Sequence, residues 1–416
     1  MLIAPRPRSA ARRGVAAGVA ALLAIGALLA SAVLPGCGTD GGTTPPDSSA
    51  FDLYAQSLIQ TFHFPGMAVG LVKNGRLVFS RGYGWADLAT SRPASADTVF
   101  TLAGTSKLVV GVAGVQLADD GTLGLDTDIA SRLLFLPRHP QFLDAPITMR
   151  LLLSHTAGLG RNDPSVTPAT VGTLAGDPGV ALGDYLASCL IAGGSRYAGG
   201  VFWTNFLPPR SAFRPGTGFA YSHVGAALAA HAVERWSSTE FEAYCHARIF
   251  SPLGMSATSW RVGGYSSAAL ATPYAFEAGS GFQALPQYTW PEYPALFLRT
   301  NVHDLARLMI ALLGSGAAGG TRILSAEAVA ELERVQNPSL QADMALHGYY
   351  DASSGPRLFG HAGRTLGWGS SFFYQRSTGL GAIVLVNAEN TEFEGDPAKG
   401  PLDDVTQKLF QIASQF

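Results

Sequence analysis

The sequence predicts an α/β protein of the α+β type, with one antiparallel sheet built from both chain ends, helices against it and a mainly helical insertion. Near the start, two strand-like runs flank Asn74-Gly75, the strongest short hairpin signal because both residues tolerate positive φ. Near the other end, two strand-like runs at 371–375 and 381–387 flank a Ser-Thr-Gly turn. The region from about 136 to 340 is typical of helices joined by Gly/Pro-rich loops.

Helices are expected beside these strands. The segment from Phe51 to Phe62 is amphipathic, and a second helical segment from about Thr105 to Asp119 stops before Gly121, a usual helix terminator. The last segment, 401–416, carries an apolar stripe at helical spacing. The stripe consists of Leu402, Val405, Leu409 and Ile412.

The composition argues against two broad classes of protein. Hydrophobic residues make up 47% of the 416 residues and charged residues only 14%, which argues against disorder. The formal net charge of -2 argues against a nucleic-acid binder, which shows basic clusters. No histidine or cysteine spacing typical of a metal site occurs between residues 51 and 416, so we expect neither a metal nor another cofactor.

Residues 1–37 are typical of an export signal. Four arginines between positions 6 and 13 precede an uncharged apolar run from Gly14 to Gly36, and Cys37 follows. This is the pattern of a secretory signal peptide, and the cysteine at its end resembles a bacterial lipobox, in which Cys37 is lipidated. Residues 38–50, rich in Gly, Thr and Pro, are predicted to be a flexible linker to a single domain at 51–416.

Two other interpretations of the N-terminal segment stay open. The apolar run is long enough to be an uncleaved membrane anchor, and Arg12-Arg13 indicates twin-arginine export. All three interpretations place residues 51–416 outside the cytoplasm, and the lipobox predicts a membrane-anchored lipoprotein in the periplasm or at the cell surface. In an oxidising compartment Cys189 and Cys245 either pair or remain two buried thiols.

Six stretches, in this order along the chain, resemble the signatures of one family. They are residues 64–75 (FPGMAVGLVKNG), 98–107 (TVFTLAGTSK), 147–159 (ITMRLLLSHTAGL), 215–223 (PGTGFAYSH), 249–255 (IFSPLGM) and 360–363 (GHAG). Together they resemble the beta-lactamase-related serine hydrolases, which include class C beta-lactamases, D,D-peptidases and family VIII-type esterases. The resemblance covers nearly all of 51–416 and implies a beta-lactamase/transpeptidase-like fold.

The first catalytic motif of this family is a serine followed three residues later by a lysine, at the start of a buried helix. In this sequence Lys107 has the lysine position, and Gly104 has the position of the nucleophilic serine. The hydroxyls of Thr105 and Ser106 are expected to point about 100° and 200° around the helix from position 104. The resemblance therefore implies a site that keeps its lysine and lacks its nucleophile.

The second motif, Y-x-N in most relatives, corresponds to Tyr221-Ser222-His223. The resemblance implies that Tyr221 shares proton transfer with Lys107. His223 replaces the asparagine, and we expect this bulkier side chain to titrate near neutrality.

The third motif corresponds to His361-Ala362-Gly363, which the resemblance places on an edge strand lining the cleft. The backbone N–H groups of Gly104 and Arg364 would form the oxyanion hole, which survives a change of side chain. His155 is expected to be structural. Leu296 and Phe297 stand where relatives usually carry glycines and are expected to crowd the cleft.

Three functions remain open from the sequence. The first is a pseudoenzyme that binds peptide, peptidoglycan fragments or esters, and the second is a weak hydrolase in which Lys107 and Tyr221 activate a water. The third is a surface scaffold. Removal of a catalytic serine leaves only about 10³–10⁴-fold acceleration over water, which favours the pseudoenzyme. The expected partners are a small molecule or peptide in the cleft and the membrane, through the lipid.

Overall fold

The computed structural model describes residues 48–160, 177, 179–197, 199–203, 212–351, 357–388 and 400–416. The predicted signal peptide, Cys37 and all but the last three residues of the predicted linker lie outside them. Within the described ranges, no helix has the length and apolar character needed to cross a bilayer.

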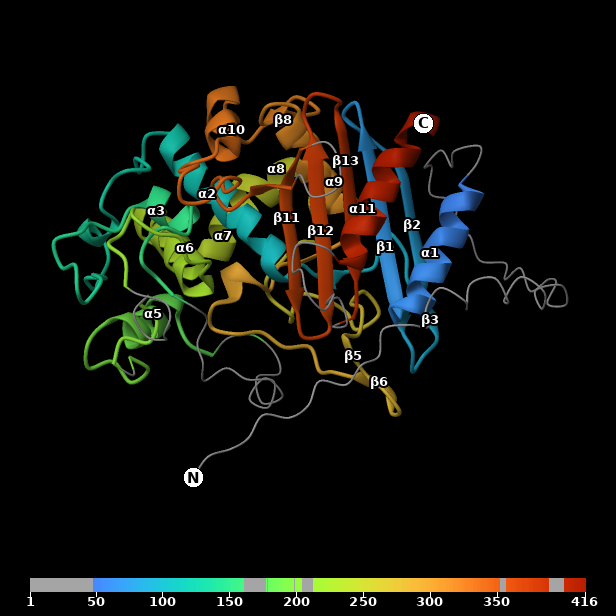
Figure 1. The fold of residues 1–416 in the computed structure, drawn as a ribbon, viewed down its shortest axis with the longest axis horizontal. Helices are drawn as coiled ribbons and strands as arrows, with labels where there is room; N and C mark the ends of the chain where they lie inside the picture. Colours follow the sequence, from blue (N-terminus) through green and yellow to red (C-terminus); the bar gives the residue numbers. More distant parts are fainter. Residues whose placement is uncertain are drawn as a thin grey trace, which may run out of the picture. The chain divides into compact units, whose positions relative to one another are not determined.

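A seven-stranded antiparallel sheet joins the two ends of the chain, so that blue and red strands lie side by side in Figure 1. Its strands, in the order β10-β11-β12-β13-β1-β2-β3, are β10 (Tyr349–Asp351), β11 (Leu358–Thr365), β12 (Trp368–Gln375), β13 (Leu380–Val386), β1 (Gly66–Lys73), β2 (Arg76–Asp87) and β3 (Arg92–Pro93). Strand β1 pairs with β13, from Met67 opposite Val386 to Lys73 opposite Leu380. The predicted sheet from both chain ends is confirmed.

The turn between β1 and β2 forms where Asn-Gly predicts it. Asn74 and Gly75 both have positive φ, at 50° and 73°. Glycine adopts this conformation without steric cost, and asparagine is among the few other residues that tolerate it.

Two helices from opposite chain ends cover one face of the sheet. Helix α1 (Ser49–Thr61) packs on β2, and α11 (Pro401–Ile412) packs on β12 and β13 (Figure 1). All four residues of the predicted apolar stripe on α11 are buried. The hydrophobic effect therefore fixes this layer, as the helical spacing predicts.

The rest of the described chain lies on the other face and beside the sheet, and it is mainly helical, as predicted. Its elements are η2 (Ala103–Thr105), α2 (Ser106–Asp119), η3 (Ile129–Ser131), α3 (Met149–Leu153), α5 (Leu182–Leu190), α6 (His223–Ser237), α7 (Phe241–Cys245), the π-helix η4 (His246–Phe250), α8 (Ser251–Leu253), η5 (Tyr293–Ala295), α9 (Val302–Leu313) and α10 (Ala326–Glu333). The short η6 (Ala413–Gln415) directly follows α11, in the layer with α1. Three short ladders that the sequence did not predict also occur. They pair β4 (Phe100–Thr101) with β7 (Arg299–Thr300), β5 (Tyr274–Glu277) with β6 (Gly281–Ala284), and β8 (Ala317–Ala318) with β9 (Thr321–Arg322).

Helix α2 is the central helix. It is buried on all sides from Ser106 to Leu117 and contacts α3, α6, α10 and η5. Apolar residues occur on every side of this helix, so burial on all sides is its favourable position. Cys189 and Cys245 are both buried thiols, in α5 and α7, which agrees with the second of the two predicted alternatives.

Candidate active site

The start of α2 is the centre of the candidate site. A single turn, η2, precedes the helix, and Ala103 within it has a φ of 48°. A left-handed alanine costs about 1–3 kcal/mol and persists only where its surroundings enforce it, as at functional sites. The turn sets Gly104 one helical turn before Lys107, with both residues buried.

A clasp formed by residues 295–298 holds this turn in place. Leu102 N–H donates to the Leu298 carbonyl at 2.8 Å, and Leu298 N–H donates to Ser106 Oγ at 3.1 Å. Leu296 and Phe297 are buried in the core, where the Phe297 ring packs 5.3 Å from the Tyr288 ring. The prediction that these two side chains crowd the cleft is therefore wrong, because the clasp directs them into the core.

Lys107 is fully buried, and its ammonium has few polar neighbours. Nζ donates to the Ala295 carbonyl at 2.9 Å and lies 4.8 Å from the centre of the Tyr221 ring. Burial lowers the pKa of Lys107 to about 7, although the buried carboxylate of Glu292 acts in the opposite direction. The sequence signals for Lys107 did not point to Glu292, which lies 185 positions further along the chain.

Tyr221 lies over Lys107 from the segment that enters α6. Its hydroxyl donates to Nε2 of His361 at 3.4 Å, because His361 Nδ1 already donates to the Ala362 carbonyl at 2.5 Å. Desolvation of its hydroxyl raises the pKa of Tyr221 well above the usual value, although 37% of the residue as a whole is exposed. Burial, with the Lys107 charge, lowers the pKa of His361 to about 3. Both side chains are therefore neutral at pH 7.

The space beside Gly104 faces these same groups. A Cβ placed on Gly104 would lie 3.2 Å from each of three atoms, namely Tyr221 Oη, His361 Cε1 and the Ala362 oxygen. The structure thus brings Gly104, Lys107, Tyr221 and His361 together from three separate parts of the sequence. A side chain added at position 104 would therefore crowd these three groups.

Strand β11 forms the wall opposite Gly104. The outermost strand of the sheet is β10, which corrects the sequence expectation for residues 358–360, but the motif residues 361–363 lie beyond its ladder and keep a backbone edge free of β10. Beyond Gly360 the ladder with β10 ends, and Ala362 N–H donates to the Tyr349 hydroxyl at 3.3 Å instead. Since backbone N–H groups alternate along a strand, the Arg364 N–H points to the same side as that of Ala362. The Arg364 N–H therefore has the direction expected of the second donor of the predicted oxyanion hole.

The hydroxyls nearest to Gly104 in sequence are engaged elsewhere. Thr105 Oγ1 donates to the His361 carbonyl at 3.2 Å and contacts Ser370 Oγ at 2.8 Å. Ser106 Oγ accepts the hydrogen bond from Leu298 described above. Neither side chain points into the space beside Gly104, as the helical geometry predicts.

Four histidines surround the pair of Lys107 and Tyr221. They are His155, His223, His347 and His361, and burial lowers the pKa of every one of them. The expectation that His223 titrates near neutrality is wrong, since burial and the Lys107 charge hold its pKa well below the usual value. His347 was not singled out from the sequence. No motif contains it, and its place is decided by tertiary contacts.

His155 acts as a support for Tyr221, in keeping with its predicted structural role. Its Nδ1 accepts the Ser222 N–H at 3.3 Å, its carbonyl accepts the Ala220 N–H at 2.9 Å, and its ring lies 4.5 Å from the Tyr221 ring. On its other side the His347 ring lies at 4.7 Å. The segment before α6 is thus fixed on both sides of Tyr221.

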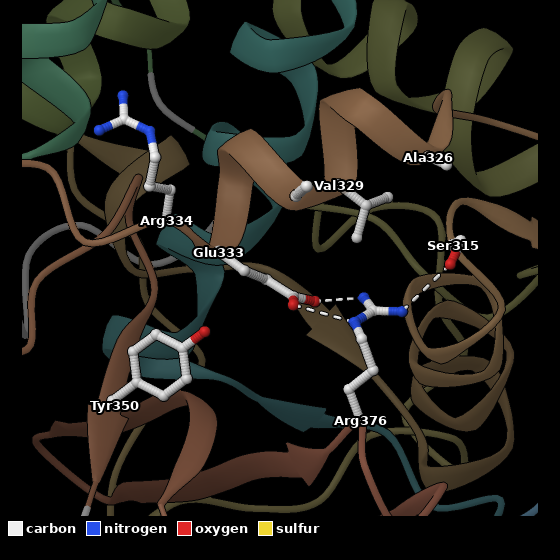
Figure 2. Close-up of a pocket in the computed structure, with 8 residues that line it drawn as sticks. Ser315, Ala326, Val329, Glu333, Arg334, Tyr350 and Arg376 are labelled. Atoms are coloured by element: carbon white, nitrogen blue, oxygen red, sulfur yellow. Dashed lines mark hydrogen bonds and ion pairs between the residues drawn. The ribbon is translucent and has the colours of Figure 1, made fainter.

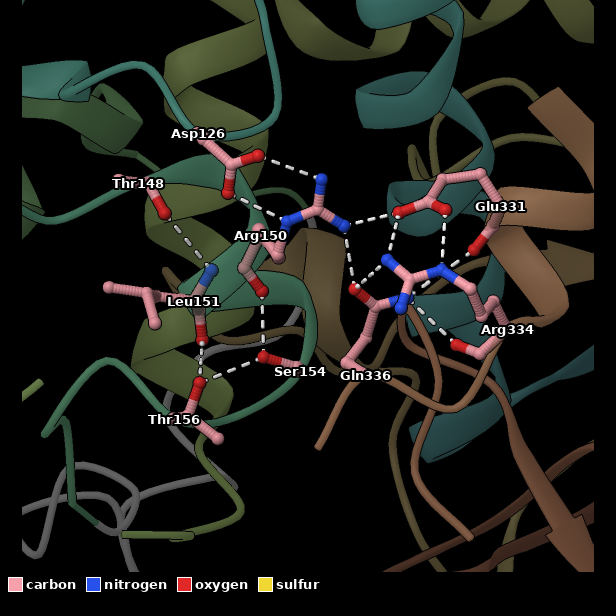
Figure 3. Close-up of polar contacts among 9 residues, drawn as sticks. All are labelled: Asp126, Thr148, Arg150, Leu151, Ser154, Thr156, Glu331, Arg334 and Gln336. Atoms are coloured by element: carbon pink, nitrogen blue, oxygen red, sulfur yellow. Dashed lines mark hydrogen bonds and ion pairs between the residues drawn. The ribbon is translucent and has the colours of Figure 1, made fainter. Parts of the chain in front are cut away.

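An ion-pair network anchors α3, the helix that ends just before His155. Arg150 in α3 bonds Asp126 and also Glu331 at the end of α10 (Figure 3). Gln336 accepts from Arg150 at 2.7 Å, and Glu331 also pairs with Arg334. The network ties α3 to α10, so it sets the position of His155 indirectly.

A separate hollow of about 390 Å³ lies beside α10 (Figure 2). Three charged side chains line it. Glu333 pairs with Arg376 and also accepts the Tyr374 hydroxyl at 2.6 Å, and Arg334 pairs with Glu331. These paired charges have a structural role. In the part of the chain that the structure describes, no group of three His, Cys, Asp or Glu side chains is placed to hold a metal ion.

The family model described as "Beta-lactamase" matches residues 51–405. The chain belongs to the beta-lactamase family. Protein flp of Staphylococcus aureus (strain MRSA252) is 22% identical over 262 residues, which cover 63% of this chain and 48% of that protein. Esterase EstB of Burkholderia gladioli is 29% identical over 229 residues, 50% of this chain and 53% of that protein. The chain thus spans about half the length of the curated relatives it matches.

Solved structures agree in fold. The D-amino acid amidase from Ochrobactrum anthropi SV3, complexed with L-phenylalanine amide, superposes with a TM-score of 0.66 at 19% sequence identity. The match covers 88% of this chain and 99% of the amidase. At this identity the similarity shows the fold alone, and the predicted beta-lactamase/transpeptidase-like fold is confirmed.

Proposed function

We propose that this chain is an exported lipoprotein of the beta-lactamase family whose cleft binds peptide, cell-wall or ester-type ligands without forming an acyl-enzyme. One observation carries the proposal: the position that faces Tyr221, His361 and β11, where the family motif places its serine, is Gly104. No hydroxyl points to that space from either neighbouring residue. The catalytic serine is absent, while the groups that surround it remain.

The remaining groups suit the binding of a carbonyl compound. The N–H groups of Gly104 and Arg364 are the proposed donors to a carbonyl oxygen, and β11 beyond Gly360 is free of β10 and offers a backbone edge to a peptide. That the relatives include an esterase and a D-amino acid amidase supports ligands of this chemical class. Lys107 and Tyr221 would contact the ligand near its carbonyl.

A weak hydrolase is the second candidate, and the state of Lys107 favours it. A pKa of about 7 suits a general base at neutral pH, which removes a proton from an attacking water. Tyr221 is less suited to this role because its hydroxyl donates to His361 and its pKa is raised. The buried Lys107 and the Tyr221 ring above it count against a scaffold in which the cleft has no role.

Exposure of the purified domain to a fluorescent penicillin and to a fluorophosphonate, read on a gel, tests this function. We expect no covalent labelling of the wild-type protein, since position 104 has no hydroxyl. An active serine hydrolase labelled in parallel shows that the probes react. A stoichiometric adduct at Ser106 or Ser222 would contradict the pseudoenzyme proposal, because it would identify another nucleophile.

A further inference from the structure

Lysine is rare in this chain, and one lysine has an unusual environment. The 416 residues contain four lysines, at positions 73, 107, 399 and 408. Lys73 and Lys408 are half-buried, whereas Lys107 is completely buried. Within the described part of the chain its Nζ has one hydrogen bond, to the Ala295 carbonyl, and no ion pair. A buried ammonium with a single acceptor is poorly solvated.

Poor solvation favours the neutral amine, which is the nucleophilic form of lysine. Burial in an apolar pocket is a known route to nucleophilic lysines. The three histidines closest to Tyr221 are neutral and provide no anionic partner for Lys107. The buried Glu292 carboxylate and the Tyr221 ring favour the ammonium, but burial acts more strongly in the opposite direction. The depressed pKa of Lys107, about 7, agrees with this environment.

The groups around the amine suit addition to a carbonyl. Gly104 leaves no side chain on the face of the helix where the family places its serine, one turn from Lys107. The proposed backbone donors at Gly104 and Arg364 would hold a carbonyl oxygen. The Tyr221 hydroxyl, whose ring lies 4.8 Å from Nζ, is a neutral proton donor.

We propose that Lys107 is a nucleophile that forms an imine with aldehydes and ketones bound in the cleft. The inference rests on the proposed function only in that the same cleft receives a carbonyl group. Nζ attacks the carbonyl carbon, the C=O π electrons move to oxygen, and the Nζ proton is transferred to that oxygen to give a carbinolamine. Tyr221 then protonates the hydroxyl, water leaves, Nζ loses its last proton to the tyrosinate, and the C=N bond forms. No oxidant or reductant is required.

Tyr221 controls access to the amine. Its ring covers Nζ on one side, yet the residue is 37% exposed, so it is the layer between Lys107 and solvent. Its hydroxyl is held by one long hydrogen bond of 3.4 Å to His361. Rotation of this side chain is therefore the proposed route by which a carbonyl compound reaches the amine.

Reductive trapping tests the proposal. The purified domain is incubated with benzaldehyde and sodium cyanoborohydride, and peptide mapping by mass spectrometry locates each benzyl group. At pH 7.5 a lysine of pKa about 7 carries roughly 10²–10³ times more neutral amine than an exposed lysine of ordinary pKa. We expect benzylation at Lys107 to be at least tenfold faster than at Lys73 or Lys408. Its rate should level off above pH 8, while the rates at the other two continue to rise.

Variants separate the chemistry from the access route. Lys107→Arg should abolish the benzylation at position 107. Lys408→Arg is the matched control, and its Lys107 should be benzylated as in the wild type. Tyr221→Ala removes both the cover and the proton donor, and it should speed modification of Lys107 because solvent water then reaches the amine and replaces the donor. Tyr221→Phe keeps the cover but loses the donor, so it should slow imine formation.

The proposal is overturned if Lys107 stays unmodified in both the wild type and a folded Tyr221→Ala variant while Lys73 and Lys408 react. That result would leave the proposed function intact, because the absence of serine labelling is measured independently. Conversely, serine labelling of the wild type would refute the proposed function without bearing on trapping at Lys107.

Discussion

Replacing Gly104 with serine would place a hydroxyl at the proposed nucleophile position, and the structure sets the conditions under which this hydroxyl can react. Gly104 has a negative φ, so the backbone accepts an L side chain. The new Cβ would lie 3.2 Å from Tyr221 Oη, His361 Cε1 and the Ala362 oxygen, which is tighter than usual. Two of these atoms end flexible side chains, and the third belongs to the backbone of β11.

The stability cost follows from this crowding. Overpacking of a well-packed site costs typically about 1–3 kcal/mol, and here the neighbours need to move by only a few tenths of an ångström. For a domain of this size, with an unfolding entropy of about 2.1 cal/mol/K per residue, that corresponds to a fall in Tm of roughly 1–4 °C. Serine suits the start of a helix, so helix propensity alone predicts almost no loss of stability. The loss comes from the close contacts around Gly104.

The activity should change in the opposite direction. Oγ would lie one turn from Lys107, whose amine is neutral in a large fraction of molecules at pH 7.5 and accepts the serine proton. We expect at least tenfold more fluorophosphonate labelling than in the wild type, and some hydrolysis of short-chain esters. Adding His223→Asn, which restores the family residue beside Tyr221, should increase both.

Gly104→Ala is the matched control for this experiment. Alanine makes the same Cβ contacts and carries no hydroxyl, so it should show the same loss of Tm and no labelling. If the serine and alanine variants fold equally and label equally, the hydroxyl at position 104 does not meet the catalytic groups. The assignment of Gly104 to the nucleophile position would then be wrong.

Two further predictions concern the anchor and the buried lysine. Cys37→Ala should move the protein from the membrane fraction to a soluble one, or block its processing. A mutant that stays membrane-bound at full precursor length would instead identify an uncleaved anchor. Lys107→Met should stabilise the fold by a few kcal/mol at most, with the full effect below pH 7 and a smaller one at each step up to about pH 10. The pKa of Lys107 is about 7 in the folded chain and about 10.4 in the unfolded chain, so the unfolded chain binds more protons between these pH values. The free energy of unfolding of the wild type should therefore rise from pH 7 to 10, and the extra stability of Lys107→Met should shrink over the same range. Denaturant unfolding at pH 6, 8 and 10 measures this difference, and an equal effect at all three pH values would rule out a buried lysine that loses its charge.

Local signals predicted the elements that their own side chains specify. Asn74-Gly75 predicted the first hairpin because few other pairs accept two positive φ angles. The stripe on 401–416 predicted α11 because the helical period brings its four apolar residues onto one face, where they are buried. The order of the motifs predicted the family. Strand β10, which covers the start of β11, has only three residues and no turn or periodicity signal that predicts it.

The sequence by itself determined the fold class, the pairing of the two chain ends and the residue types at the candidate site, because periodicity, turn chemistry and motif spacing are local properties. Only the tertiary structure decided their chemical states. Burial among elements distant in sequence makes Lys107 an amine of pKa about 7 and holds His223 and His361 neutral. The clasp at 295–298 turns Leu296 and Phe297 into the core, and the closeness of Tyr221, His361 and β11 to Gly104 sets the crowding that any new side chain there would meet. Desolvation and packing depend on which surfaces meet, and no local pattern encodes them.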